Sequence, residues 1–111
     1  MPDDIDRLIR RLIGGDERAA AEIHERSRTE AAPVLLVAAA LLAAEPGDLL
    51  DRAVGAATTT RDRQLVAIAR AHLDGDEERL DAFVRDHLAE HPDNILAAWI
   101  AAQHTTFREK P

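Results

Sequence analysis

The sequence predicts an all-α domain of about seven helices folded into antiparallel hairpins. Apolar residues recur three or four positions apart along most of the chain, the spacing that places them on one face of a helix. The stretch Ala31 to Ala44 carries no charge, and a helix that is apolar on all sides must be enclosed by other elements. The dipeptide Gly-Asp occurs at 15–16, 47–48 and 75–76, at the spacing of about 30 residues that is typical of stacked helical hairpins.

The first two helices precede the apolar stretch. Asp3 or Asp4 can cap the first helix, and Gly14-Gly15 ends it because glycine tolerates the left-handed conformation that follows a helix. Asp16 then caps the second helix. The inward-facing residues are expected to be Ile5, Leu8, Ile9 and Leu12 in the first helix, and Ala20, Ile23 and Ser27 in the second.

The central helix begins at Thr29 or Glu30 and ends at Pro46-Gly47. Pro33 is compatible with its first turn, where the missing N–H has no partner in any case. Asp48 caps a fourth, shorter helix. The inward-facing residues expected in this fourth helix are Leu49, Leu50, Val54 and Ala57.

A run of threonines at 58–60 favours a loop and a cap, so the fifth helix is expected to begin at Arg61 and to end at Gly75. Asp76 caps the sixth helix and Asp93 the seventh. The expected inward-facing residues are Leu65, Ile68, Ala69 and His72 or Leu73 in the fifth helix, Leu80, Phe83, Val84, His87 and Leu88 in the sixth, and Ile95, Leu96, Trp99, Ile100 and Phe107 in the seventh.

Composition and charge narrow the class of protein. A chain of 111 residues forms one domain, which we expect to span 1–107, with a frayed tail at 108–111. The net charge of −7 disfavours binding to nucleic acid or to an anionic membrane. The sequence contains no cysteine and does not start with a basic segment followed by an apolar one, so a cytoplasmic location is expected.

The segment from Arg61 to Ala102 resembles a tetratricopeptide repeat. It consists of the helix RDRQLVAIARAHL, the turn DGD, the helix EERLDAFVRDHLAE, the turn HPDN and the start of a third helix, ILAAWIAA. It is similar in particular to bacterial proteins of the tetratricopeptide repeat protein 38 family. The resemblance implies an α-α superhelix and a role in protein interaction, and it implies no catalytic residue.

A different function is suggested by His87-Leu88-Ala89-Glu90-His91, which matches the pattern H-x-x-E-H of some zinc peptidases. His87 and His91 could reach one zinc ion from the same helix face, with Glu90 as general base. Only His104 and Glu109 follow as donors that are not helix caps, although a catalytic zinc needs a third protein ligand. The alternative interpretation is that His87 faces the core or a groove while Glu90 and His91 are solvated.

The seventh helix has no partner among the three expected hairpins, and its apolar face is wide. A large exposed apolar face is typical of an interface, so we expect Ile95, Trp99, Ile100 and Phe107 to contact another protein, a peptide or a second copy of the chain. Burial against the last hairpin is the other interpretation. The sequence as a whole indicates a non-catalytic protein- or peptide-binding module without a cofactor, with a metal-binding protein or small zinc hydrolase as the alternative.

Overall fold

The computed structural model describes the backbone of residues 2–109 and the side chains of residues 4–103. This part of the chain forms seven α-helices and no strand, which confirms the predicted all-α fold. The helices are α1 (Pro2–Ile13), α2 (Glu17–Ser27), α3 (Pro33–Leu42), α4 (Gly47–Ala56), α5 (Thr60–Asp74), α6 (Glu77–Glu90) and α7 (Ile95–Glu109). Residues 108–111, the predicted frayed tail, lie outside the described side chains.

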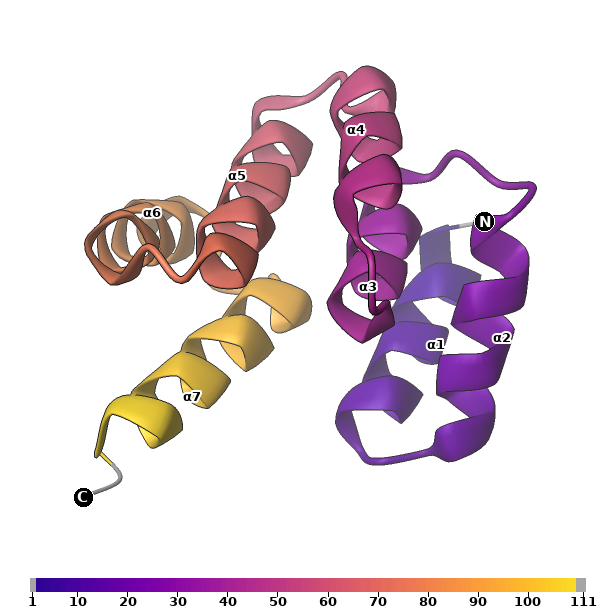
Figure 1. The fold of residues 1–111 in the computed structure, drawn as a ribbon, viewed down its shortest axis with the longest axis horizontal. Coiled ribbons are helices and arrows are strands. Elements are labelled where there is room, and N and C mark those ends of the chain that lie inside the picture. The colour runs from indigo at the N-terminus through magenta and orange to yellow at the C-terminus, as the bar shows by residue number, and fades with distance from the viewer. Residues whose placement is uncertain (1, 110–111) are drawn as a thin grey trace.

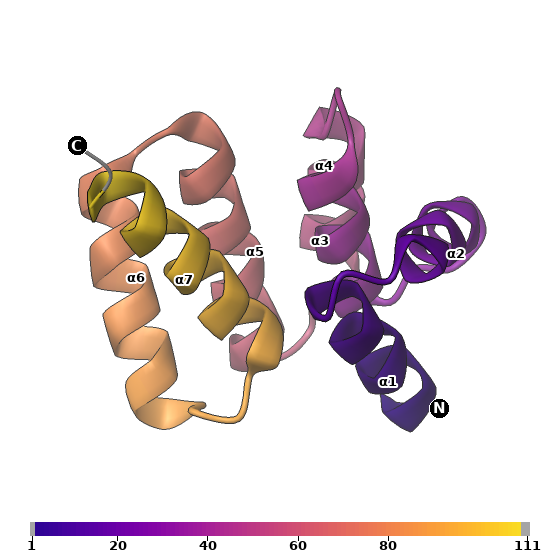
Figure 2. The same ribbon diagram turned by 90° about the horizontal axis from the view of Figure 1, so that it is seen from below.

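The helices form two groups that lie side by side (Figures 1 and 2). One group contains α1 to α4 and the other contains α5 to α7. Consecutive helices from α1 to α7 contact one another, as expected for a series of hairpins. Contacts of α3 with α5 and of α1 with α7 join the two groups, so the first and last helices of the chain meet. The structure therefore brings together residues that are distant in the sequence.

The apolar stretch forms the centre of the core, as predicted. α3 packs against α1, α2, α4 and α5, and its residues from Leu35 to Ala40 are all buried. The helix is shorter than expected, because it begins at Pro33 and ends at Leu42. Thr29 and Glu30 remain in the preceding loop, where their N–H groups bond to the carbonyl of Arg26.

Two of the three Gly-Asp pairs form the predicted corners. Gly15 and Gly75 have φ angles of 90° and 73°, in the left-handed region that favours glycine. The aspartates that follow them cap the next helices, where Asp16 and Asp76 accept backbone N–H bonds of 2.9 and 3.2 Å. Thr59 caps α5 in the same way, with a bond of 3.1 Å, which confirms the predicted role of the threonine run.

The third Gly-Asp pair has a different role, and the predictions that Gly47 ends one helix and that Asp48 caps the next were wrong, because both residues lie inside α4. Gly47 is the first residue of α4, and Pro46 precedes it as the N-cap. The chain leaves α3 at Ala43, whose φ of −87° and ψ of 148° are extended. The turn is therefore complete before Gly47, because an extended residue and a proline with a preset φ redirect the chain without a left-handed glycine.

Two predicted inward-facing residues are exposed. Val54 is 54% exposed, since α4 contacts only α3 and α5 extensively and buries a narrow face around Leu50 and Ala53. Phe83 is 36% exposed on α6, although Leu80 and His87 on the same helix are buried. Helical spacing identifies an apolar face, but the number of neighbouring helices decides how much of it is covered.

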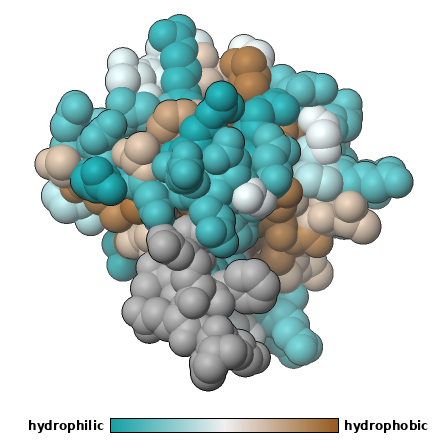
Figure 3. Space-filling model, turned by 60° about the vertical axis from the view of Figure 1, so that its left-hand side comes forward, coloured by the Kyte–Doolittle hydropathy of each residue, from teal (hydrophilic) through white to brown (hydrophobic). Residues whose placement is uncertain are grey.

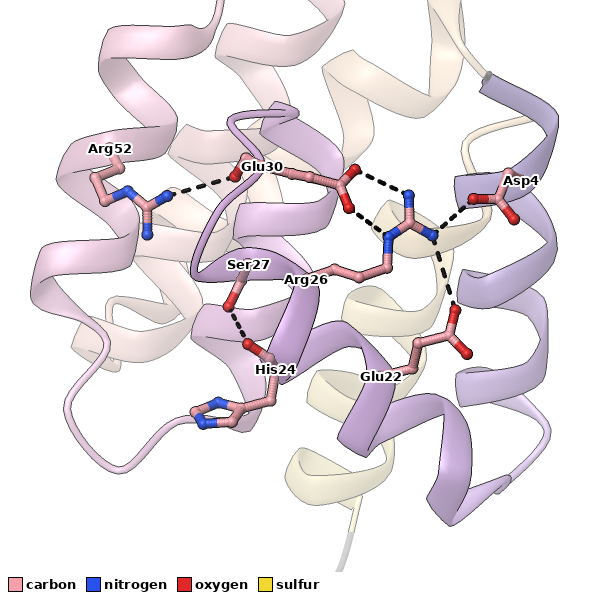
Figure 4. A network of polar contacts seen from close by, with 7 residues as sticks. All are labelled: Asp4, Glu22, His24, Arg26, Ser27, Glu30 and Arg52. Carbon is pink, nitrogen blue, oxygen red and sulfur yellow. Dashed lines mark hydrogen bonds and ion pairs between the residues drawn. The ribbon is translucent and has the colours of Figure 1, made fainter.

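Ion pairs around Arg26 connect α2 with its surroundings (Figure 4). The Arg26 guanidinium bonds to both carboxylate oxygens of Glu30, at 2.6 and 2.9 Å, and to Asp4 of α1 at 2.7 Å. The bond from Arg26 lowers the pKa of Glu30, and the same bond raises the pKa of Arg26. Arg52 of α4 donates to the carbonyl oxygen of Glu30 at 3.4 Å, so polar contacts hold the loop before α3 from both sides.

Candidate binding pocket

A pocket of about 400 Å³ opens between the two groups of helices. Its size is within the range of roughly 300–1,000 Å³ that is common for ligand pockets. Most of its walls are apolar, with four polar or charged side chains among them. The lining residues are Ile5, Asp6 and Ile9 of α1, Ala32, Pro33 and Val34 at the start of α3, Arg61 of α5, and Asp93, Asn94, Ile95 and Leu96 at the start of α7.

The helices that line this pocket are the odd-numbered α1, α3, α5 and α7. Successive helices of a series of hairpins alternate in direction, so every second helix runs the same way. The odd-numbered helices therefore begin at the same end of the molecule, and their N-terminal parts converge. The contact between α1 and α7 closes one side of this convergence. Ile5 and Ile9 were predicted as inward-facing residues, and they reach both the core and the pocket. No sequence spacing relates them to Val34 or Ile95, so only the fold shows that these residues share a wall.

Charged side chains at the pocket are compensated by partners. Arg61 Nη1 lies 3.2 Å from both carboxylate oxygens of Asp93, and this bond lowers the pKa of Asp93. Asp6 accepts a bond of 2.9 Å from Arg10, one turn further along α1. The Arg61–Asp93 pair ties the start of α5 to the loop before α7, and thus spans one edge of the pocket.

The N-terminal end of α7 is held by Asn94 and not, as predicted, by Asp93. Asn94 Oδ1 accepts the backbone N–H of Ala97 at 3.3 Å, which is the bond of an N-cap residue. Asp93 is exposed and forms the ion pair with Arg61 instead. Asn94 is 5% exposed, so its amide must find partners within the protein.

His87 is the buried partner of Asn94. Its ring is fully buried, with Nδ1 2.7 Å from Gln64 Oε1 and Nε2 2.8 Å from Asn94 Nδ2. Because Gln64 Oε1 can only accept and Asn94 Nδ2 can only donate, the ring is neutral with its proton on Nδ1. Burial lowers the pKa of His87, and the positive charges of His91 and Arg61 lower that pKa further.

The alternative prediction of a zinc site requires His87 as a ligand, but His87 is hydrogen-bonded to other side chains. Both ring nitrogens of His87 have hydrogen-bond partners, so zinc could bind there only after one of these bonds breaks. His91 lies beside it, with the two ring centroids 4.9 Å apart, and Glu90 is exposed. Within residues 4–103 no three His, Asp or Glu side chains are grouped to hold a metal ion. The side chains of His104 and Glu109 lie outside the described residues.

Of the four residues predicted to form an interface on α7, the three whose side chains are described lie in different environments. Ile95 is half-buried and lines the pocket, and Trp99 is half-buried against the core. Ile100 is fully buried among core residues, so it offers no accessible surface. The side chain of Phe107 lies outside the described residues.

The remaining surface offers fewer apolar features. A second pocket of about 370 Å³ lies at the turn between α5 and α6, beside Leu80, Asp76 and Gln103. The face in Figure 3 is mostly hydrophilic, with small hydrophobic areas, one of them beside the residues drawn in grey. The pocket between the two groups of helices is the larger of the two described pockets, and it is lined by Ile95, which was predicted to contact a partner.

The chain matches no family model, and neither the curated proteins nor the solved structures contain a match to it. No helix in the described part of the chain is long and apolar enough to span a bilayer.

Proposed function

We propose that this protein is a non-catalytic binding module, or a small accessory subunit, that holds a segment of a protein partner in the pocket between its two groups of helices. The pocket lined by the N-terminal parts of α1, α3, α5 and α7 is the observation that carries the proposal. A cytoplasmic protein of a bacterium would be consistent with the sequence and with its resemblance to tetratricopeptide repeats.

The chemistry of the walls supports an apolar side chain as the part of the partner that enters. The half-buried residues Ile5, Val34 and Ile95 offer hydrocarbon surface from three different helices. Burial of such surface contributes about 25 cal/mol per Å², so one large side chain supplies about 1.5–3 kcal/mol and the backbone and flanking residues of the peptide must supply the rest. Asn94, the most buried polar residue of the lining, already uses its amide within the protein.

The charge of the protein supports a partner segment with basic residues beside that side chain. Asp6 and Asp93 in the lining are paired with Arg10 and Arg61, so the attraction comes from the chain as a whole, which carries a net charge of −7. Long-range attraction of this kind mainly increases the association rate and weakens as salt is added. Lys or Arg residues that flank the apolar anchor would remain in solvent near Asp6 and Asp93.

Affinity selection from a random peptide library would test the proposal. We expect selected peptides to share a large apolar residue with Lys or Arg nearby. Ala32 lines the pocket in an extended conformation, so Ala32→Phe fills the pocket without breaking a helix. This variant should raise the dissociation constant of a selected peptide by about tenfold or more, as measured by calorimetry.

Two control variants make the experiment specific. Ala21→Phe places the same ring on the exposed surface of α2 and should leave the affinity unchanged. Asp6→Asn should reduce the affinity for basic peptides at low salt, whereas Glu45→Gln in the loop before α4 should not. Equal affinities for wild type and Ala32→Phe, or selected peptides without a shared apolar residue, would show that the pocket is not the binding site.

A further inference from the structure

The side chains behind the pocket form one continuous chain of hydrogen bonds. Gln64 of α5 bonds to His87 of α6, His87 bonds to Asn94, and Asn94 bonds to the N–H of Ala97 in α7. His87 and Asn94 are both buried, and Asn94 also lines the pocket. This chain of bonds joins all three helices of the second group at the end of α7 that forms a pocket wall.

The bonds are compatible with only one protonation state of His87. In the neutral ring, Nδ1–H donates to Gln64, and the lone pair of Nε2 accepts from the Asn94 amide. A proton added from solvent to Nε2 turns this acceptor into a donor, which then faces the Asn94 N–H group. Rotating the Asn94 amide by half a turn restores the bond to His87, but it places Nδ2 against the N–H of Ala97. No orientation of Asn94 satisfies both neighbours once His87 is charged.

We propose that protonation of His87 releases the start of α7 from its cap and loosens the pocket wall formed by Ile95 and Leu96. The proton would thus reduce binding in the pocket as the pH falls below neutral. The effect on binding rests on the proposed function, whereas the effect on α7 can be measured without any partner.

The charged groups around His87 shift its pKa in opposite directions. Arg61 of α5 and His91 at the end of α6 disfavour a second positive charge, whereas Glu90 of α6 and Asp93 of the following loop favour it. Residues 95–103 of α7 carry no ionisable side chain. Burial acts together with Arg61 and His91, and the pKa of His87 in the folded protein is accordingly below the ordinary histidine value of 6.5.

The sign of the pH effect follows from this lowered pKa. His87 is neutral in the folded and unfolded states well above pH 6.5, so it causes no pH dependence there. As the pH falls below this value, the unfolded or locally opened state takes up a proton before the folded state does. The opening equilibrium then rises by up to about tenfold per pH unit, the limit for one proton. The rise ends where folded His87 itself becomes protonated.

Three measurements on the intact chain test the proposal between pH 7.5 and pH 5. The ring resonances of His87 give its pKa, and the emission of Trp99, the only tryptophan, reports on α7. Amide exchange at Ala97, corrected for the intrinsic effect of pH, gives the opening equilibrium of the cap. We expect a pKa below 6.5, loss of protection at Ala97 and a change in Trp99 emission over the same pH range.

Asn94→Asp is the decisive variant, because a carboxylate keeps the cap to Ala97 but favours a charged His87. It should raise the pKa of His87 by about one unit or more and remove the loss of protection above pH 5. His87→Gln should abolish the pH effect, and Asn94→Asp still tests the proposal if that variant does not fold. Replacement of His24 or His104 by Gln should leave the effect unchanged and so controls for other histidines.

Two results would overturn the proposal. One is protection at Ala97 that stays constant while His87 titrates. The other is a pH effect of unchanged midpoint in Asn94→Asp. If the pH effect on α7 is found but no peptide binds the pocket, then the proposed function fails while the switch itself stands.

Discussion

Replacing Asn94 with alanine tests the cap of α7 and the buried bond to His87 in a single variant. The change removes the acceptor of the Ala97 N–H and the donor to His87 Nε2. Loss of an N-cap costs about 1 kcal/mol, within a range of 0.5–2. The Nε2 atom of His87 remains buried without a partner, which costs about 1–3 kcal/mol. We therefore expect the free energy of unfolding to fall by about 2–4 kcal/mol, a large part of the roughly 5–15 kcal/mol typical of a domain.

The matched control is the neighbouring residue. Asp93→Ala removes an exposed ion pair with Arg61 and leaves the cap intact, so its effect on stability should be much smaller and should decrease further in high salt. Urea denaturation followed by circular dichroism at pH 7.5 would measure both variants, at a pH where His87 is neutral. A loss below about 0.5 kcal/mol for Asn94→Ala, which is typical of surface substitutions, would refute the reasoning. An equal loss for Asp93→Ala would restore Asp93 as the cap.

Three further predictions concern the fold and the oligomeric state. Gly75→Ala should destabilise the protein by about 1 kcal/mol because the φ of Gly75 is 73°. Gly47→Ala should be neutral or stabilising by up to about 1 kcal/mol, since Gly47 is helical and has open space where a Cβ would lie. Urea denaturation would distinguish the two variants, and equal effects would contradict the two different roles. Leu36→Ala in α3 should cost about 3–5 kcal/mol, because Leu36 is fully buried, and Leu42→Ala, at 42% exposure, should cost less than half as much in the same assay. If α7 pairs with a second copy through Trp99, light scattering should give the mass of two chains for wild type and of one chain for a folded Trp99→Ala; the same mass for both would exclude a homodimer held by this residue.

Helix positions were largely predictable because they depend on local chemistry. Gly15 and Gly75 end helices where the backbone needs a left-handed residue, and Asp16 and Asp76 satisfy the N–H groups that the next helix leaves open. The same dipeptide at Gly47 was wrongly predicted to end a helix. There the chain had already turned between the extended Ala43 and Pro46, so the local sequence was compatible with two different turns.

The candidate site was predictable only in part. Ile95 was selected from the wide apolar face of α7, and it does line the pocket. Ile100 was selected for the same reason, but α7 packs against α1, α5 and α6, which leaves Ile100 no exposed surface. Helical spacing cannot distinguish a face covered by the same chain from a face left for a partner. The burial of His87 agrees with one of the two sequence interpretations, but its bonds to Gln64 and Asn94 connect residues from three elements.

The sequence by itself determined that the chain is helical, that the segment around Leu36 is enclosed, and where most helices begin and end. These properties follow from spacing, capping and glycine conformations within a few neighbouring residues. The tertiary structure decided which helix ends meet at the pocket, which residue caps α7, and which side chains satisfy His87. Such properties depend on contacts between distant segments, for example of α1 with α7, and no local pattern specifies which of several compatible packings has the lowest free energy.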